Sequence, residues 1–449
     1  MKEETQSLLH RRKKLSPFQI IILGFAGLIL AGALLLMLPF ASAAGEVTPF
    51  SDAIFTSTSA VCVTGLIVYD TATYWSDLGQ LVIICLIQIG GMGVITAALS
   101  LMVLSGKKIN LMHRSTMQEA VAAPNMGGIV RLTIFIIKVI FAVEAVGAMA
   151  MLPVFCRDFG AGRGIWMSVF HSISAFCNAG FDLMGVQARF SSLTGYADSC
   201  TVNVAIMMLI VIGGIGFSTW DDIRANRFKV QKYRMQSKVI LCTSGILIFL
   251  PAIYFFFAEF AGTDPGERVL SSFFQSVTTR TAGFNTAELT ALSETGQLVM
   301  ILLMLIGGSP GSTAGGMKTT SIAVLFAAML SVFRREEYVG FFGRRISDQT
   351  VRNAVTLLML YMALFLGGGM IISRLEGLPV IHCLFETASA IGTVGLSLGI
   401  TPELCVVSKI ILMVLMFFGR VGGLTLIYAA VAGMQKNIAR LPQEKLMVG

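Results

Sequence analysis

Residues 55–65 read FTSTSAVCVTG, and this pattern decides the fold because it recurs along the chain. It returns as FHSISAFCNAG at 170–180 and as FETASAIGTVG at 385–395, with the same step from Phe to Gly. A looser copy, FQSVTTRTAG at 274–283, is one residue shorter. The closing glycines at 65, 180, 283 and 395 divide the chain into four units of roughly 110 residues.

Each copy predicts a short apolar helix, rich in Ser and Thr, that runs into a brief extended segment ending at a glycine. Glycine adopts left-handed backbone angles without steric cost, so consecutive carbonyls can point the same way. Four such segments around an axis would form rings of carbonyl oxygens that replace the hydration shell of a cation, as in potassium channels. The alternative is four ordinary loop glycines that follow amphipathic helices. The predicted filter segments are Val63, Thr64, Gly65; Asn178, Ala179, Gly180; Thr281, Ala282, Gly283; and Thr393, Val394, Gly395.

The composition is that of an integral membrane protein in contact with lipid. Hydrophobic residues make up 55% of the chain, charged residues 13%, and the mean hydropathy is +0.79. Several charge-free stretches exceed the roughly 20 residues that a helix needs to cross a bilayer. We therefore expect an all-α membrane protein with eight spanning helices. In each repeat a spanning helix, a re-entrant pore helix with its filter segment and a second spanning helix would surround one central pore.

Basic residues predict the orientation in the cell membrane, because cytoplasmic segments carry an excess of Lys and Arg. Clusters lie at 11–14, 107–114, 224–238, 334–352 and 436–445, so both termini are expected in the cytoplasm. Acidic residues such as Asp70 and Asp182 flank the filter segments on the opposite side. The expected organisation is a cytoplasmic N-terminus (1–15), repeats at 16–110, 111–225, 226–340 and 341–435, and a cytoplasmic C-terminus (436–449).

A glycine-rich break interrupts the last helix of the third repeat, in the stretch GGSPGSTAGGMKTT at 307–320. Proline removes a backbone donor and glycines add flexibility, so a regular helix is not expected here. The spacing fails the phosphate-binding pattern, since a methionine separates the last glycine from the lysine. The sequence predicts a mobile intramembrane gate under the filter, formed by Gly307, Gly308, Pro310, Gly311, Gly315, Gly316 and Lys318.

Arg420 lies alone in the last apolar helix, within the sequence GRVGG. Intramembrane arginines usually face a bundle interior or water. Equivalence of the repeats would place Arg420 beside the gate, where its charge would repel resident cations. The alternative is an ion pair between helices. Arg280 and Glu386, two further candidates at membrane depth, are expected to be structural and to brace adjacent short helices.

The residues described so far resemble the Trk/Ktr/HKT superfamily of potassium transporters. The resemblance rests on the fourfold plan, Val63-Thr64-Gly65-Leu66, Arg280-Thr281-Ala282-Gly283-Phe284, the glycine-rich break and Gly419-Arg420-Val421-Gly422-Gly423. The short segment before the first helix favours the Ktr-type (KtrB-like) membrane subunit. The resemblance implies K⁺ uptake, Na⁺ as an activator in some members, a homodimer with one pore per subunit and a cytoplasmic nucleotide-binding subunit of the RCK type. It also implies that 307–320 is the gate and Arg420 the arginine beneath the filter.

Glycine in all four filter segments points to K⁺, which would bind at the backbone carbonyls. The segments otherwise differ from one another, so a sodium or weakly selective monovalent cation transporter stays open, as does a secondary symporter for another solute. No cofactor is expected in this chain. An enzyme is not expected either, because the sequence holds no convincing cluster of His, Cys or paired carboxylates.

Overall fold

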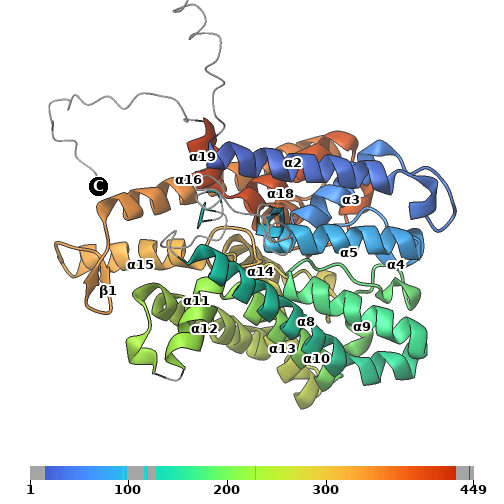
Figure 1. Ribbon diagram of the computed structural model, residues 1–449, viewed down its shortest axis with the longest axis horizontal. Coiled ribbons are helices and arrows are strands. Elements are labelled where there is room, and N and C mark those ends of the chain that lie inside the picture. The colour runs from blue at the N-terminus through green and yellow to red at the C-terminus, as the bar shows by residue number, and fades with distance from the viewer. Residues whose placement is uncertain are drawn as a thin grey trace, which may run out of the picture.

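The computed structural model describes residues 16–94, 96–98, 116, 118–119, 128–227, 229–430 and 444. Most of these residues are helical, and the described part of the chain has one small hairpin of β1 (Gly340–Phe341) and β2 (Arg344–Arg345), as Figure 1 shows. The predicted cytoplasmic N-terminus and nearly all of the predicted C-terminus lie outside the described residues.

Four times along the chain, a long helix is followed by a short helix, an extended segment and a further apolar helix. The long helices are α2 (Pro17–Leu36), α8 (Ile129–Phe159), α12 (Met235–Ala258) and α16 (Asp348–Glu376). The short helices are α3 (Phe50–Val61), α9 (Ala161–Phe176), α13 (Pro265–Thr278) and α17 (Val380–Gly392). The last group comprises α5 (Asp77–Met92), α10 (Cys200–Gly214) with α11 (Phe217–Asn226), α14 (Glu294–Leu305) with α15 (Thr319–Phe333), and α18 (Val406–Val421) with α19 (Gly423–Ala430). A single turn, α4 (Thr71–Tyr74), precedes α5.

Serine caps set the starts of several of these helices. Ser16 accepts a hydrogen bond from the Gln19 amide while the Gln19 side chain returns to the Ser16 amide, which is a complete capping box before α2. Ser76, Ser293 and Ser347 accept backbone N–H groups in the same way before α5, α14 and α16. The caps satisfy backbone donors that a helix N-terminus leaves unpaired.

Three of the described helices, α2, α12 and α16, are long and apolar enough to cross a membrane. The count rises to five if α10 with α11 and α18 with α19, bent by 95° and 90°, are each one span. The expected eight spans and their grouping into four repeats stay a prediction. The remaining three would involve α8, which contains Glu144 and several basic residues, α5, which ends at Met92, and the interrupted pair α14 and α15.

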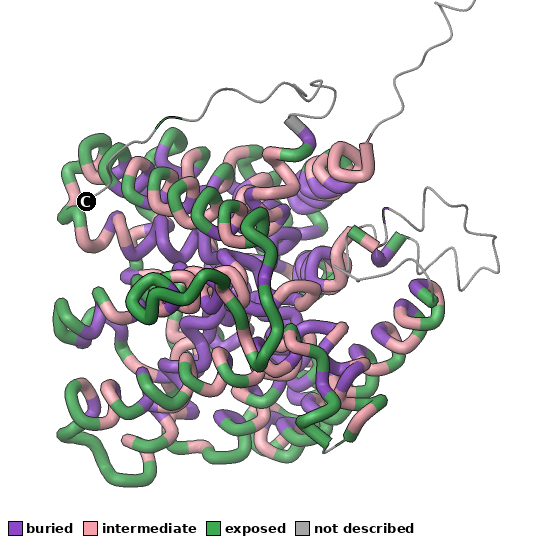
Figure 2. Tube along the Cα trace, turned by 90° about the vertical axis from the view of Figure 1, so that its left-hand side faces the viewer, coloured by how far each residue is buried: buried purple, intermediate pink, exposed green. Residues whose placement is uncertain are grey.

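The burial pattern separates a packed centre from an apolar exterior. Buried residues gather in the middle of the molecule and exposed ones around it (Figure 2). Exposed large hydrophobic residues cover the outer faces of the long helices, for example Leu34 on α2 at 61% and Leu250 on α12 at 67% exposure. An apolar surface of this extent matches a lipid environment.

Each short helix packs against the long helix of its own unit, and the two ends of the chain meet. In Figure 1 the blue α2 and α3 lie beside the red α18 and α19, and contacts between α3 and α18 join the first unit to the fourth. The four extended segments are thereby brought to the centre of the molecule.

Candidate functional site

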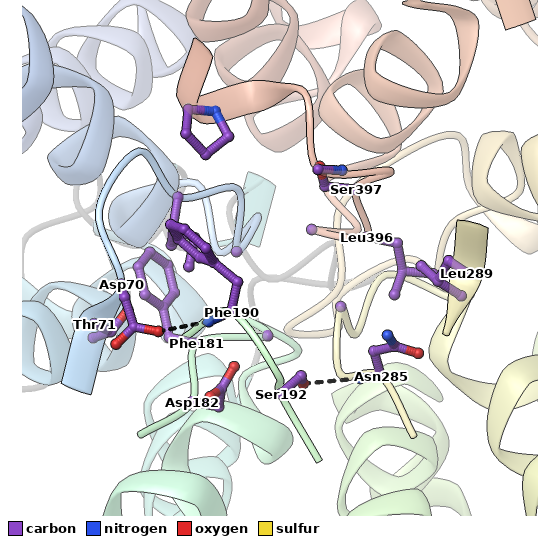
Figure 3. A pocket seen from close by; sticks show the side chains of 17 residues that line it. Asp70, Thr71, Phe181, Asp182, Phe190, Ser192, Asn285, Leu289, Leu396 and Ser397 are labelled. Carbon is purple, nitrogen blue, oxygen red and sulfur yellow. Dashed lines mark hydrogen bonds between the residues drawn. The ribbon is translucent and has the colours of Figure 1, made fainter. Parts of the chain in front are cut away.

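The four filter glycines predicted from the sequence line one pocket. Gly65, Gly180, Gly283 and Gly395 all border it, together with polar residues that include Asp70, Asp182, Asn285 and Ser397 (Figure 3). The glycines come from segments separated by more than a hundred residues in sequence, yet they share a single small space. The structure therefore brings the predicted filter segments together.

The glycines contact one another in a closed cycle. A Cβ placed on Gly65 would strike the carbonyl oxygen of Ala179, and one placed on Gly180 would lie 2.7 Å from the oxygen of Ala282. The same relation continues from Gly283 to the Val394 oxygen and from Gly395 to the Thr64 oxygen, which returns to the first segment. At these four positions a side chain would enter the neighbouring segment, so hydrogen is the only substituent that fits without movement.

Left-handed backbone angles recur at two positions in every segment. The glycines have φ between 70° and 94°, and the residues two places earlier, Val63, Asn178, Thr281 and Thr393, have φ between 50° and 67°. Such angles are uncommon in non-glycine residues and are strained for the β-branched ones. Alternation between left-handed and ordinary angles turns successive carbonyls toward the same side, whereas a regular strand would alternate them.

Hydroxyl groups of the short helices hold the segments in this conformation. Ser59 and Ser389 each accept a hydrogen bond at 3.0 Å from the amide of their filter glycine. Ser174 donates to the Phe181 carbonyl at 2.7 Å, and Thr278 donates to the Phe284 carbonyl at 2.6 Å. The Ser and Thr content that marks the repeated pattern therefore has a local structural purpose.

A second set of hydroxyls ties each short helix to its long helix. Each hydroxyl donates to a backbone carbonyl of the long helix. The bonds are Ser57 to Ile29 at 2.7 Å, Ser172 to Glu144 at 2.6 Å, Ser276 to Ile248 at 2.6 Å and Thr387 to Phe365 at 3.3 Å. In the third copy both sets of hydroxyls lie one residue closer to the glycine than in the others. The missing residue of that copy thus falls between its helix and its glycine.

The glycine-rich break predicted as a gate is a folded loop, 306–318, between α14 and α15. Its ends pair as a parallel bridge, with the Gly307 amide donating to the Met317 carbonyl at 2.8 Å and the Thr319 amide to the Gly308 carbonyl at 3.0 Å. The loop also contacts two filter segments. A Cβ on Gly315 would strike the Thr393 side chain in the fourth segment, and the Thr313 hydroxyl lies 3.1 Å from Asn178 Oδ1 in the second. The loop therefore lies directly against the filter segments.

Two cations bond to carbonyl groups of this loop, Lys318 at its end and Arg420 from α18. Lys318 donates to the carbonyl oxygens of Ala314 and Gly315 at 2.8 and 3.3 Å. Arg420 donates to the carbonyls of Thr313 in the loop and of Gly90 and Gly91 at the end of α5. Its partners are backbone carbonyls, and among the described residues no ion pair forms at this guanidinium. Pro310 and Gly311 lie in the same loop. The Gly311 carbonyl accepts a hydrogen bond from the Phe217 amide at 2.7 Å, which joins the loop to the start of α11.

The sequence predicts that Arg280 and Glu386 are structural residues that brace adjacent short helices. Among the described residues neither forms an ion pair, and their side chains bond to groups outside those helices. Arg280 donates to the Ser244 hydroxyl at 3.1 Å, which fastens its segment to α12. Glu386 accepts from the hydroxyls of Ser397 and Thr401 at 2.6 Å each and from the Leu398 amide at 3.1 Å. Nearby hydroxyl and amide donors satisfy the carboxylate, so no distant arginine is needed.

An ion pair that the sequence analysis missed joins the first and last units. Lys409 of α18 donates to Asp52 of α3 at 3.1 Å, and the Tyr69 hydroxyl donates to the other carboxylate oxygen of Asp52 at 2.8 Å. Both charged side chains are buried, with 11% and 13% exposure. The only signal in the sequence was a lysine inside an otherwise apolar helix.

Two carboxylates lie at the mouth of the pocket, where Figure 3 shows Asp70 and Asp182 on the same side of it. Asp70 accepts from the amides of Ala72, Thr73 and Phe190, so its charge is well solvated by protein donors. Asp182 accepts from the Met184 amide at 2.9 Å. Burial, with a smaller contribution from the neighbouring Asp70, raises the pKa of Asp182 to about 7.

These features define a class of protein: a helical membrane protein in which four segments of one chain meet at a central pocket, with a glycine-rich loop packed against two of the segments. The chain belongs to the TrkH family of cation transport proteins, whose model matches residues 5–440.

Several known proteins are similar over nearly the full chain. The potassium/sodium uptake protein NtpJ of Enterococcus hirae is 39% identical, with 98% of each chain covered. The Ktr system potassium uptake protein B of Bacillus subtilis is 34% identical over 97% of each chain. The crystal structure of the potassium transporter TrkH from Vibrio parahaemolyticus has the same fold, with a TM-score of 0.72 at 21% identity over 93% of this chain and 86% of that one.

Proposed function

We propose that the protein takes up K⁺ across the cell membrane through the ring formed by the four filter segments. The observation that carries the proposal is the closed cycle of Gly65, Gly180, Gly283 and Gly395 with left-handed angles two residues earlier in each segment. The carbonyls of residues 63–65, 178–180, 281–283 and 393–395 would replace the hydration shell of the ion. The carboxylates of Asp70 and Asp182 would raise the cation concentration at the entrance.

The glycine-rich loop is the proposed gate. Its contacts with the filter segments on one side and with Arg420 on the other support a position across the conduction path. A guanidinium at this depth would discourage cations from resting below the filter while the loop is in place. Displacement of the loop would open the path without any change in the long helices.

Family membership also supports the wider assembly that we propose. The chain would form a homodimer with one pore per subunit, lie in the cell membrane with both termini in the cytoplasm, and be opened by a cytoplasmic RCK-type nucleotide-binding subunit. The four repeats at 16–110, 111–225, 226–340 and 341–435 would each contribute one quarter of the pore.

A second candidate is a transporter that also carries Na⁺ or depends on it. It is favoured by the name of the Enterococcus hirae relative, a potassium/sodium uptake protein, and by the different residues in the four segments. Uptake of ⁸⁶Rb⁺ into liposomes that contain the purified protein, competed in turn by K⁺ and Na⁺, separates the two candidates. Competition by K⁺ alone is the expected result. Equal competition would favour the second candidate, and a variant with a shortened loop that gives no uptake would refute both.

A further inference from the structure

Thr313 is the point at which the glycine-rich loop is joined to its surroundings. It is fully buried, and every polar group it has is bonded outside the loop. Its amide donates to the Gly213 carbonyl at 3.3 Å, and its carbonyl accepts from Arg420. Its hydroxyl lies 3.0 Å from the Phe176 carbonyl and 3.1 Å from Asn178 Oδ1. Buried polar groups are costly when unpaired, so these bonds hold the loop in one position.

Asn178 continues the connection into the filter segments. It occupies the left-handed position of the second segment, with φ of 58°, and is 1% exposed. Its side-chain amide lies 3.3 Å from the Arg280 carbonyl and 3.4 Å from Thr281 Oγ1, both in the third segment. One short side chain therefore bridges two filter segments and the loop.

The other three segments lack this connection. Val63 has no polar group at the corresponding position, and Thr281 is bonded to Asn178 itself. The hydroxyl of Thr393 is buried against the loop without a hydrogen-bond partner. Among the described residues, the side-chain bond from this position to the loop is thus particular to the second segment.

We propose that Asn178 and Thr313 form a latch that couples the loop to the filter, an inference that rests on the proposed function. With the loop in place, the single proton of the Thr313 hydroxyl is shared between two acceptors, Asn178 Oδ1 and Phe176 O. When the loop moves away, Asn178 Oδ1 and Phe176 O lose the Thr313 hydroxyl. The start of the second segment, at residues 176–178, is then no longer attached to the loop. The side chains of Asn178 and Thr313 act by positioning, because in the proposed function the ion contacts the backbone carbonyl of Asn178 and not its side chain.

The latch predicts that removal of one hydroxyl opens the loop. Thr313→Val keeps the shape of the side chain and the backbone bonds to Gly213 and Arg420 but removes the one donor that Asn178 Oδ1 and Phe176 O share. The loss of such a bond shifts an equilibrium by about tenfold, so ⁸⁶Rb⁺ flux into liposomes without any partner protein should rise about tenfold. Thr313→Ser keeps the hydroxyl and should stay much closer to wild type.

A matched control and a double-mutant cycle make the test specific. Thr356→Val makes the same chemical change at an exposed hydroxyl of α16 that bonds only to the Arg352 carbonyl, and its flux should equal that of wild type. Asn178→Gly suits the left-handed angle and removes the acceptor, so it should raise the flux by itself. When Asn178→Gly is already present, adding Thr313→Val should raise the flux by less than it does alone, because the shared bond is already lost.

Two results would refute the latch and leave the proposed function intact. One is equal flux in Thr313→Val and Thr313→Ser. The other is that the effects of Thr313→Val and Asn178→Gly on flux multiply fully. A different result would overturn both the proposed function and the latch: no ⁸⁶Rb⁺ uptake by wild type or by any of these variants, although each protein is folded and monodisperse. The Asn178→Gly variant tests the same bond from the filter side if Thr313→Val does not fold.

Discussion

Replacement of Gly65 by alanine adds a single methyl group to the ring of filter glycines. The φ of Gly65 is 92°, and the new Cβ would collide with the carbonyl oxygen of Ala179 and lie 3.2 Å from the Cα of Gly180. The collision involves backbone atoms, so it cannot be relieved by rotation of a side chain. The second filter segment must therefore move away from the first.

The structure offers a control that separates backbone strain from the collision. Gly45 has a similar left-handed φ of 71°, is exposed, and has no atom within 4 Å of the position that a Cβ would take. The left-handed angle costs an alanine at either site about 1–2 kcal/mol. Only at Gly65 does the methyl group also displace a carbonyl of the ring. We expect Gly65→Ala to lower K⁺ over Na⁺ discrimination at least tenfold, which corresponds to about 1.4 kcal/mol of differential binding.

The assay is ⁸⁶Rb⁺ uptake into liposomes, with K⁺ and Na⁺ as competitors, for wild type, Gly65→Ala and Gly45→Ala. The ratio of the inhibitory concentration of Na⁺ to that of K⁺ should fall for Gly65→Ala and match wild type for Gly45→Ala. If folded Gly65→Ala protein keeps the wild-type ratio, the carbonyls near Gly65 do not select the ion. If both variants lose discrimination equally, backbone strain rather than the ring explains the loss.

Three further outcomes follow from the same structure. Shortening the 306–318 loop should raise ⁸⁶Rb⁺ flux in the absence of a partner protein; a correctly inserted deletion with unchanged flux would argue against a gate. Lys409→Met leaves the buried Asp52 carboxylate without its cation and should lower the free energy of unfolding by about 3–5 kcal/mol, measured by thermal unfolding in detergent, and Asp52→Asn added to it should restore part of the loss. The raised pKa of Asp182 means that the folded protein binds this proton more tightly than the unfolded chain, so stability falls as pH rises from about 4 to about 7, and the carboxylate is charged mainly above pH 7. Uptake should therefore increase as the external pH rises through 7, and an unaltered pH profile in Asp182→Asn would exclude this residue as the cause.

Local pattern was sufficient to locate the ring of glycines. The repeated Phe, Ser and Gly positions mark the places where a short helix must end and a left-handed residue must follow, and these are properties of the adjacent sequence. The interruption of the third unit was visible for the same reason, since proline and clustered glycines act on the local backbone. The position of Arg420 beside the loop followed from aligning the glycine clusters of different units.

Contacts between distant side chains could not be deduced in this way. Lys409 and Asp52 are 357 residues apart, and nothing near either of them in sequence indicates the other. Arg280 and Glu386 are expected from the sequence to brace adjacent short helices, and their side chains instead bond to the hydroxyl groups of Ser244 on α12 and of Ser397 beyond α17. The third segment was ambiguous until Ser276 and Thr278 showed where its missing residue falls.

The four glycines of the ring belong to one polypeptide, and this has a genetic consequence. In a channel assembled from identical subunits, every substitution in the gene appears at all symmetric positions at once. Here a codon change alters one quadrant and spares the other three, so a residue such as Asn178 can specialise without a counterpart opposite it. The selectivity and gating that we propose could thus be adjusted one quadrant at a time, and natural sequences should vary independently from one quadrant to the next.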